Sequence, residues 1–290
     1  MARLETILVT GATGNVGREV VRALVARGAA VRAADRHPAR IDALFDARVA
    51  SVALDFLDPA TFDAAAEGCR SVFLLRPPAV SDVKPTLNAF VDRARALGVG
   101  HVVFLSVAGA GNNKLVPHHA VEVHLRARGH AWTLLRPGFF AQNFGDAYRR
   151  DIVEDARVYV PAGRGRVAFV DVRDVAEVAA TIFASPSEHE SQAYTLTGVE
   201  AVDFRTAAAT LTDVLGRAIR YDAASLIGYL LHLRAREMPW AQVAVQTVLH
   251  AGLRLGQAEP VDPTLARLLG RRPRLLREYM QDHRLTWAPP

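Results

Sequence analysis

The chain has 290 residues, of which 50% are hydrophobic and 22% charged, a composition typical of globular proteins and not of disordered or collagenous ones. Its single cysteine, Cys69, cannot form an intrachain disulfide, and neither a leader-like segment nor an apolar run of about 20 residues occurs, so we expect a cytoplasmic protein with no membrane partner. The formal charge of +5 arises in residues 217–290, which hold 11 arginines against six acidic residues.

Short β-branched segments alternate with helical patterns through the first half of the chain, which is the βαβ signature of a parallel sheet. Between them, segments such as 16–27 place apolar residues on one stripe at helical spacing. The pattern predicts an α/β fold with a doubly wound parallel sheet. Its six expected strands are Thr6–Thr10, Ala30–Asp35, Arg48–Leu54, Ser71–Leu75, His101–Ser106 and Trp132–Arg136.

The end of the first strand carries the most informative motif. Residues 7–17 read ILVTGATGNVG, a strand that runs through G-x-x-G-x-x-G directly into a helix. Gly11 allows the tight turn, Gly14 lets the backbone approach a diphosphate, and Gly17 lets the helix pack closely on the strand. The helix N-terminus then offers N–H groups and the positive end of its dipole to phosphates. The loop residues expected to contact a dinucleotide are Gly11, Thr13, Gly14, Asn15, Val16 and Gly17.

Two residues at the end of the second strand predict opposite cofactor preferences. Asp35 would accept hydrogen bonds from the ribose hydroxyls of NAD and repel a 2′-phosphate, whereas Arg36 would pair with that phosphate. A solvated strand end is the structural alternative for both. The residues therefore leave the choice between NAD(H) and NADP(H) open.

Two further strand ends contribute candidate cofactor contacts by their position in the fold. Asp55 and Phe56 follow the third strand and are expected at the adenine rim. Leu75, Arg76 and Pro77 follow the fourth strand and are expected to pass beneath the ribose. Ordinary loop chemistry is the alternative for each segment.

After about residue 137 the rhythm changes to loops, isolated strands and longer helices, including predicted helices at 172–184 and 201–216. We expect a dinucleotide-binding domain at 1–150, with elements near 151–200 able to pack back onto it, and a smaller, mostly helical substrate-binding lobe at 151–290. Arginines among leucines at 268–279 predict a helix with a solvated basic face, and no nucleic-acid partner is expected.

Several motifs, taken together and in order, resemble the NmrA-like branch of the atypical short-chain dehydrogenases/reductases. The resemblance implies a Rossmann-type NAD(P)-binding domain with a small C-terminal lobe. Family members include quinone and dye reductases as well as regulatory proteins that bind the dinucleotide without turning it over. The family's arginine after the second strand, here Arg36, narrowly favours NADP(H) over NAD(H). The motifs are TGATGNVG, FLLRPP, FLSVAGAG, His-x-x-x-Glu at His118–Glu122, TLLRPGFFAQNF at 133–144, FVDVRDVAEVAA at 169–180, YTLTGVEAV at 194–202 and the tail LLGRRPRLLREY.

Most short-chain reductases protonate the product with a tyrosine that a lysine four residues later activates, and this chain has no such pair. Ser106, at the end of the fifth strand, is the candidate for the companion serine. His118 and Glu122 are spaced i,i+4 and share a helix face, where the carboxylate would orient the imidazole and raise its pKa toward neutrality. His118 is therefore the candidate proton donor, with a surface ion pair as the alternative. Lys114 is a second candidate acid.

A zinc site at His118, Glu122 and His124 is disfavoured, because neither an H-E-x-x-H motif nor a cysteine pair accompanies these residues. We expect no metal.

These features predict an NAD(P)H-dependent oxidoreductase that transfers hydride to a quinone-like or other aromatic acceptor. Such an acceptor needs little acid chemistry, because its delocalised product takes a proton from water. Pro137, Phe139 and Phe140 would wall the nicotinamide side of the pocket, or else pack as ordinary core. The alternatives are a non-catalytic NAD(P)-binding sensor and a tailoring reductase or isomerase of secondary metabolism. The chain is expected to be a monomer or a homodimer.

Overall fold

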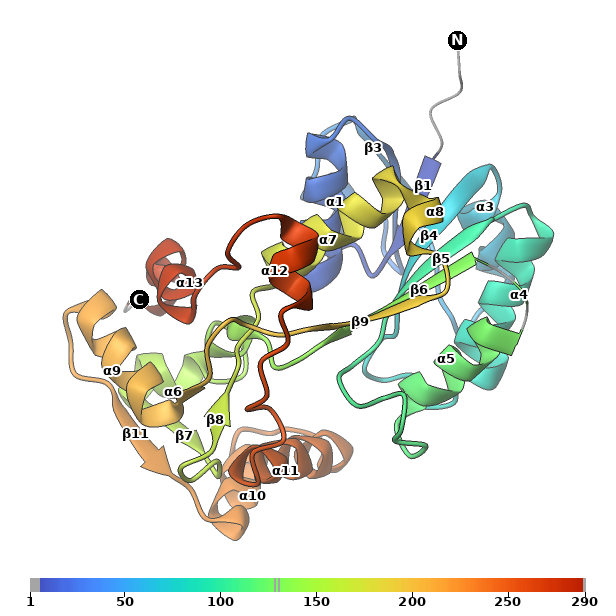
Figure 1. Ribbon diagram of the computed structural model, residues 1–290. Coiled ribbons are helices and arrows are strands. Elements are labelled where there is room, and N and C mark those ends of the chain that lie inside the picture. The colour runs from blue at the N-terminus through green and yellow to red at the C-terminus, as the bar shows by residue number, and fades with distance from the viewer. Residues whose placement is uncertain (1–5, 128, 130, 289–290) are drawn as a thin grey trace. The chain divides into compact units, whose positions relative to one another are not determined.

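The computed structural model describes residues 6–127, 129 and 131–288. The chain forms two compact units, which are taken one at a time below (Figure 1). Unit 1 comprises residues 1–137 and 172–196, and unit 2 comprises residues 138–171 and 197–290. The chain therefore leaves unit 1 at Pro137, returns for one helix pair and a strand, and leaves again. The domains expected at 1–150 and 151–290 stay a prediction, because compactness does not show that either unit folds alone.

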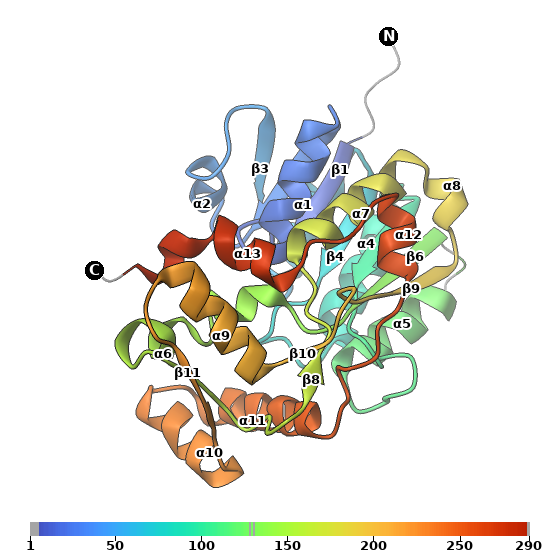
Figure 2. The same cartoon turned by 60° about the vertical axis from the view of Figure 1, so that its left-hand side comes forward.

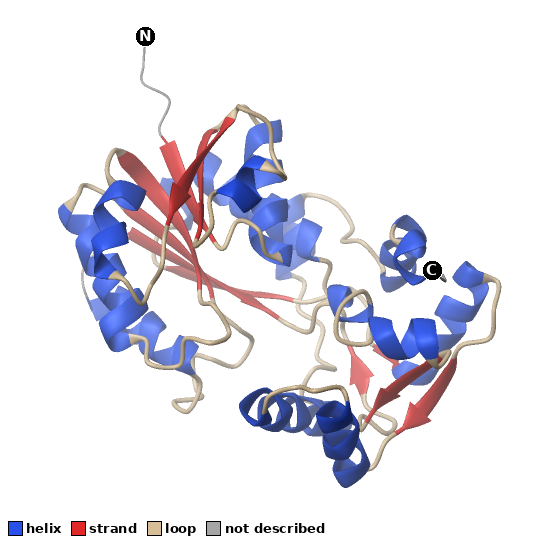
Figure 3. Cartoon of the chain, turned by 180° about the vertical axis from the view of Figure 1, so that it is seen from behind, coloured by secondary structure: helices blue, strands red, loops and turns tan. Residues whose placement is uncertain are grey.

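Unit 1 is built on a seven-stranded sheet in the order β3-β2-β1-β4-β5-β6-β9, with every neighbouring pair parallel (Figure 3). The predicted doubly wound parallel sheet is confirmed, and each of the six expected strands is present within two residues. The seventh strand, β9, was not predicted, because it lies outside the alternating βαβ pattern of the first half of the chain. The strands are β1 Thr6–Thr10, β2 Ala30–Asp35, β3 Val49–Ala53, β4 Cys69–Leu75, β5 His101–Leu105, β6 Ala131–Pro137 and β9 Gln192–Leu196.

Helices cover both faces of this sheet (Figure 1). On one face α1 (Asn15–Ala26) packs along α7 (Val172–Ala184), and the other face carries α3, α4 and α5. The stripe expected on α1 is confirmed, because Val20, Val21 and Leu24 are buried. The remaining helical segments of unit 1 are α2 Ala39–Asp42, η1 Pro59–Thr61, α3 Phe62–Ala66, the π-helical turn η2 Lys84–Asn88, α4 Ala89–Ala96, α5 Pro117–Ala127 and α8 Pro186–His189.

Unit 2 combines two small strand pairs with helices (Figure 2). The parallel pair is β7 (Arg157–Val160) with β11 (Arg220–Ala223), and the antiparallel pair is β8 (Arg166–Val167) with β10 (Val202–Asp203). Unit 2 has its own hydrophobic core, in which Phe144 contacts Phe169 and Tyr148 edge to face. The helices are η3 Ala141–Phe144, α6 Arg149–Glu154, α9 Phe204–Leu215, α10 Leu226–Ala235, α11 Trp240–Arg254, α12 Thr264–Leu269, α13 Leu276–Asp282 and η4 Arg284–Trp287.

The expected basic helix at 268–279 is wrong in detail. Helix α12 ends at Leu269, because Gly270 adopts a left-handed conformation with φ of 66°, which does not continue the helix. Arg271 and Arg272 are exposed in the loop before α13, where Arg274 is half-buried, and Arg277 lies in α13 itself. Arg272 pairs with Glu278 at 2.6 Å. Within the described residues, no helix has both the length and the apolar character that crossing a membrane requires.

Candidate functional site

The glycine loop connects β1 to α1 through a tight turn. Gly11 has a φ of 62°, and its carbonyl accepts the N–H of Gly14 at 3.0 Å. The carbonyl of Gly14 then accepts the N–H of Arg18 at 2.9 Å, which starts the helix. Gly14 is exposed, and no side chain caps α1 at this position. The helix therefore begins on bare backbone, as an anion-binding helix N-terminus does.

The three glycines of the loop differ in how much space a side chain would have at each position. A Cβ on Gly17 would lie 2.2 Å from the carbonyl oxygen of Gly11, so the helix approaches the loop too closely for any side chain. A Cβ on Gly11 would lie 3.1 Å from the side chain of Leu75, and the positive φ adds strain. At Gly14 the nearest atom is 3.3 Å away and belongs to the loop itself, so its outer side is open. This cradle fits the diphosphate of a dinucleotide.

Asp35, at the end of β2, is tied to the glycine loop. The hydroxyl of Thr13 donates a short hydrogen bond to its carboxylate, and the backbone N–H of His37 donates to Oδ1 at 2.9 Å. Arg36 beside it is exposed. The carboxylate predicted to read the ribose therefore also fixes the glycine loop against the end of β2.

Arg76 organises the loop after β4. Its Nη1 donates to the carbonyls of Pro77, Pro78 and Val80 at 3.0, 3.3 and 2.6 Å, so the side chain turns back over its own loop. Its Nε donates to Nε2 of His118 at 3.3 Å. Burial lowers the pKa of the guanidinium, which remains charged at neutral pH. Arg76 thus joins the ends of β4 and α5 at the carboxyl edge of the sheet.

Behind this edge lies a buried charge network centred on Glu122 of α5. Arg136 donates to both of its carboxylate oxygens, at 2.9 and 2.5 Å, and the hydroxyl of Ser106 donates at 2.6 Å. Arg126, one turn on, adds an ion pair at 3.4 Å. Burial alone would raise the pKa of Glu122, but these donors hold it below its ordinary value, and Glu122 in turn raises the pKa of Arg136. The network locks α5 to the ends of β5 and β6.

The predicted pairing of His118 with Glu122 is wrong. Both oxygens of Glu122 are engaged by Arg136 and Ser106, while Nε2 of His118 accepts from Arg76. Burial, with a further contribution from the Arg76 charge, lowers the pKa of His118 to about 4, and Glu122 only partly opposes this. The imidazole is therefore neutral at physiological pH and is not poised to donate a proton. Ser106 is 2% exposed, so its hydroxyl serves the buried carboxylate and is not presented to a ligand.

Other expected cofactor contacts divide between core and surface. Phe56 is 5% exposed and packs edge to face on Phe90 at 5.4 Å, so its side chain is core and does not form an adenine rim. The side chain of Val16 is likewise buried. Asp55 is half-buried, and its Oδ1 accepts the N–H of Leu57 at 2.9 Å, which closes the loop after β3.

The segment predicted to wall the nicotinamide is divided between the units. Pro137 is the last residue of β6 in unit 1, whereas Phe139 and Phe140 belong to unit 2. The ring of Phe139 lies 5.6 Å from that of His250 and 6.0 Å from that of Phe169. Their role beside the nicotinamide stays a prediction.

Sequence reasoning missed Arg136. It is the last residue but one of β6, next to the buried residues of the TLLRP segment, and a charge in that position requires a partner. That signal was available and would have called for an acidic partner, but only the structure identifies it as Glu122.

Comparisons with known proteins identify the chain's relatives. Residues 11–186 match the family model described as NAD(P)H-binding. The chain belongs to this family. It is 32% identical to the NAD(P)H azoreductase of Xenophilus azovorans over 286 residues, which is 96% of this chain and 97% of that protein. The predicted kinship with the NmrA-like group is confirmed, and this NAD(P)H-binding family member is an oxidoreductase.

Solved structures of relatives share its fold. The NADPH-dependent quinone oxidoreductase of Escherichia coli, complexed with NADPH, matches with a TM-score of 0.85 and 26% identity, covering 96% of this chain and 99% of that one. The triphenylmethane reductase of Citrobacter, complexed with NADP(H), matches with a TM-score of 0.84 and 24% identity, covering 95% and 99%. The Rossmann-type fold of this NAD(P)H-binding protein is therefore shared across reductases.

Proposed function

We propose that the protein transfers hydride from NADPH to an aromatic acceptor of the quinone or azo class. The observation that carries the proposal is the open glycine loop, which can hold a dinucleotide. In the same unit, His118, the histidine candidate for proton donation, is neutral at physiological pH. Two relatives support the acceptor class, since they are named as an NAD(P)H azoreductase and an NADPH-dependent quinone oxidoreductase.

The cradle would hold the diphosphate on the backbone at Gly14 and on the N-terminus of α1. At the end of β2, Thr13 and His37 already donate to the carboxylate of Asp35, which offsets part of its repulsion for a 2′-phosphate. The exposed guanidinium of Arg36 then supplies the attraction for that phosphate. These residues support a preference for NADP(H). The bound cofactor supplies the hydride.

The state of two candidate proton donors, a tyrosine of unit 1 and His118, supports this acceptor class. Of the six tyrosines, Tyr194 alone belongs to unit 1, and its hydroxyl bonds to Nδ1 of His189. His118 accepts a hydrogen bond from Arg76 and carries no second proton at neutral pH. A simple ketone would need a proton from the protein as its alkoxide forms, whereas a quinone or azo compound leaves a delocalised anion that water can protonate.

Anaerobic stopped-flow mixing tests this function. Native protein with NADPH is mixed with a benzoquinone, an azo dye or, as the matched control, a simple aliphatic ketone. We expect oxidation of NADPH by the quinone or the azo dye and none by the ketone. Equal or faster reduction of the ketone would show that the protein supplies a proton donor after all. An absence of oxidation by every acceptor would overturn the proposal.

A further inference from the structure

Helices α10 and α11 of unit 2, which lie side by side (Figures 1 and 2), leave large apolar side chains uncovered. In the part of the chain that the structure describes, fourteen large hydrophobic side chains are exposed, and eight of them lie in residues 226–255. Single exposed apolar residues are ordinary on a protein surface, whereas a concentration of them marks an interaction site. The eight are Leu226, Ile227, Leu231, Trp240, Val245, Val248, Leu249 and Leu255.

Helix α11 is apolar on its outer face as well as on its inner face. The buried residues of the inner face include Val243, His250 and Leu253. Val245, Val248 and Leu249 follow the outer face at i, i+3 and i+4, and all three are exposed. Arg254 is the only charged residue in the sequence of the helix, and it stands at the last position. A helix that is apolar all round is normally covered on every side, so the outer face of α11 calls for a partner.

Helix α10 extends this apolar surface. Ile227 and Leu231 lie one turn apart and are both exposed, and α10 packs along α11. Trp240, at the start of α11, is also exposed, and the guanidinium carbon of Arg234 lies 4.7 Å from its ring centre. The α10–α11 face is the name we give to the uncovered side chains Ile227, Leu231, Trp240, Val245, Val248 and Leu249.

The two arginines of residues 226–249 are already engaged within unit 2. Arg236 pairs with Asp151 at 2.7 Å and with Glu154 at 2.6 Å. Arg234 donates to the carbonyl of Met238 at 2.5 Å. Helices that bind a lipid surface hold free lysines or arginines beside their apolar side. Because the arginines here are committed to their own unit, the α10–α11 face favours a protein partner over a membrane.

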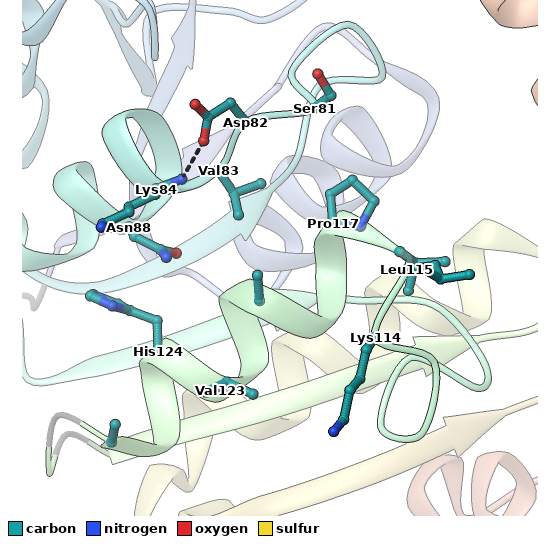
Figure 4. Close-up of a pocket in the computed structure, with 13 residues that line it drawn as sticks. Ser81, Asp82, Val83, Lys84, Asn88, Lys114, Leu115, Pro117, Val123 and His124 are labelled. Carbon is teal, nitrogen blue, oxygen red and sulfur yellow. Dashed lines mark hydrogen bonds between the residues drawn. The ribbon is translucent and has the colours of Figure 1, made fainter.

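A hollow of unit 1, between η2 and α5, provides a contrast (Figure 4). Val83 and Val123 line it among the charged residues Asp82, Lys84 and Lys114, and the two lysine side chains point to different sides. Charged residues are depleted from the core of protein interfaces, so a mixed lining of this kind is typical of solvated surface. The α10–α11 face consists of aliphatic side chains and one indole, and it has the composition of an interface core.

The size of the α10–α11 face suits a stable dimer. Its six side chains are between 55% and 74% exposed. At about 200 Å² for a fully exposed large apolar side chain, their uncovered area is roughly 800 Å². The largest apolar patch on a typical monomer is about 300–600 Å², and a specific interface buries about 800 Å² on each partner. The face is therefore larger than a monomer ordinarily leaves uncovered and large enough for a specific interface.

We propose that the α10–α11 face binds a second copy of this chain and forms a homodimer about a twofold axis. Such an interface brings the same surface of both copies together, so an apolar face meets its own complement, whereas a charged face would meet like charges. Val245 lies between Val248 and Leu249 around α11 and is central to the outer face of the helix. The dimer is independent of the dinucleotide and of the proposed hydride transfer.

Sedimentation equilibrium of the full chain tests the proposal. At about 100 µM we expect a mass twice the 31.5 kDa of one chain. Val245→Glu should weaken the dimer at least about a hundredfold, because each dimer would bury two unpaired carboxylates. Leu115→Glu is the matched control, since it changes a leucine of unit 1 that is 93% exposed and lies outside the face, and it should leave the native mass unchanged.

Thermal unfolding checks that the variants fold, and Val248→Glu is a second variant of the same face should Val245→Glu fail to fold. A native chain that is monomeric at about 100 µM would overturn the proposal. So would a folded Val245→Glu variant that dimerises as tightly as the native chain, because the interface would then lie elsewhere. A monomeric native chain that sediments with phosphatidylglycerol vesicles would assign the face to lipid instead.

Discussion

At the scale of single residues, Asp35 and Arg36 are the pair that we propose distinguishes NADP(H) from NAD(H). They are adjacent in sequence, yet the first is anchored to Thr13 and His37 while the second is exposed. The carboxylate is thus partly committed to holding the loop, whereas the guanidinium can reach a ligand. Sequence alone left these two residues in balance, because it does not show which side chain is already hydrogen-bonded.

Arg36→Ala should weaken NADPH binding about tenfold and leave NADH binding unchanged, because the lost pair involves only the 2′-phosphate. Isothermal titration of both cofactors measures this. Arg22→Ala is the control, since Arg22 is an exposed arginine of α1 that pairs with Glu19 at 2.8 Å. An equal loss for NADH, or no loss for NADPH, would remove Arg36 from the recognition of the phosphate.

The buried carboxylate of Glu122 is a second residue-scale test. Glu122→Gln leaves the guanidinium of Arg136 without its counter-charge and should cost about 3 kcal/mol in the free energy of unfolding. Glu154→Gln removes a half-exposed carboxylate that also binds arginine and should cost less than about 1 kcal/mol. Urea unfolding at neutral pH compares them. Similar small losses for both would mean that the network around Glu122 contributes little.

At the scale of elements, the sequence was most informative where periodicity and spacing are strict. The six strands and α1 were predicted because β-branched runs, glycines and an apolar stripe each have one local explanation. The strand β9 and the break at Gly270 were missed, since pairing with β6 and a left-handed helix end are set by the surrounding fold. For the same reason, the i,i+4 spacing of His118 and Glu122 did not show that Arg136 and Arg76 bind them.

The junction of β1 and α1 gives the element-scale prediction. Gly17→Ala places a Cβ 2.2 Å from the carbonyl oxygen of Gly11 and should displace the helix from the loop. Cofactor binding should fall by at least about tenfold, because the N–H groups of the first turn no longer converge on the diphosphate.

Gly100→Ala is the matched control, because a Cβ there has no neighbour closer than 3.8 Å and the backbone needs no positive φ. Fluorescence titration with NADPH compares the two variants. If Gly17→Ala bound NADPH like the native chain, the close approach of helix and loop would not matter for binding.

At the scale of the whole molecule, three histidines have a pKa that is lowered to about 4: His118, described above, His101 in unit 1 and His250 in unit 2. Burial is the main cause for His101 in unit 1, where the nearby His189 also contributes, and for His250 in unit 2. The pKa of histidine in an unfolded chain is near 6.5, so as the pH falls the unfolded chain binds protons that the folded chain does not bind. Stability should therefore decline from pH 6.5 to about 4, by about 3 kcal/mol for each histidine.

Urea unfolding as a function of pH measures this decline. His250→Gln should make the decline shallower by the share of one histidine, and His37→Gln, which changes an exposed histidine, should leave it unchanged. A native stability that stays constant between pH 6.5 and 4.5 would contradict the assignment of neutral, buried imidazoles.

The central claim is direct hydride transfer from the nicotinamide to an aromatic acceptor. NADPH deuterated at C4 on one face or on the other is oxidised by the protein with a quinone under anaerobic conditions, and mass spectrometry reads the deuterium left in NADP⁺. The account predicts that the label is lost entirely from one face and retained entirely on the other, because a bound nicotinamide presents a single face. A mixed label, or no oxidation despite saturable binding of NADPH, would contradict it.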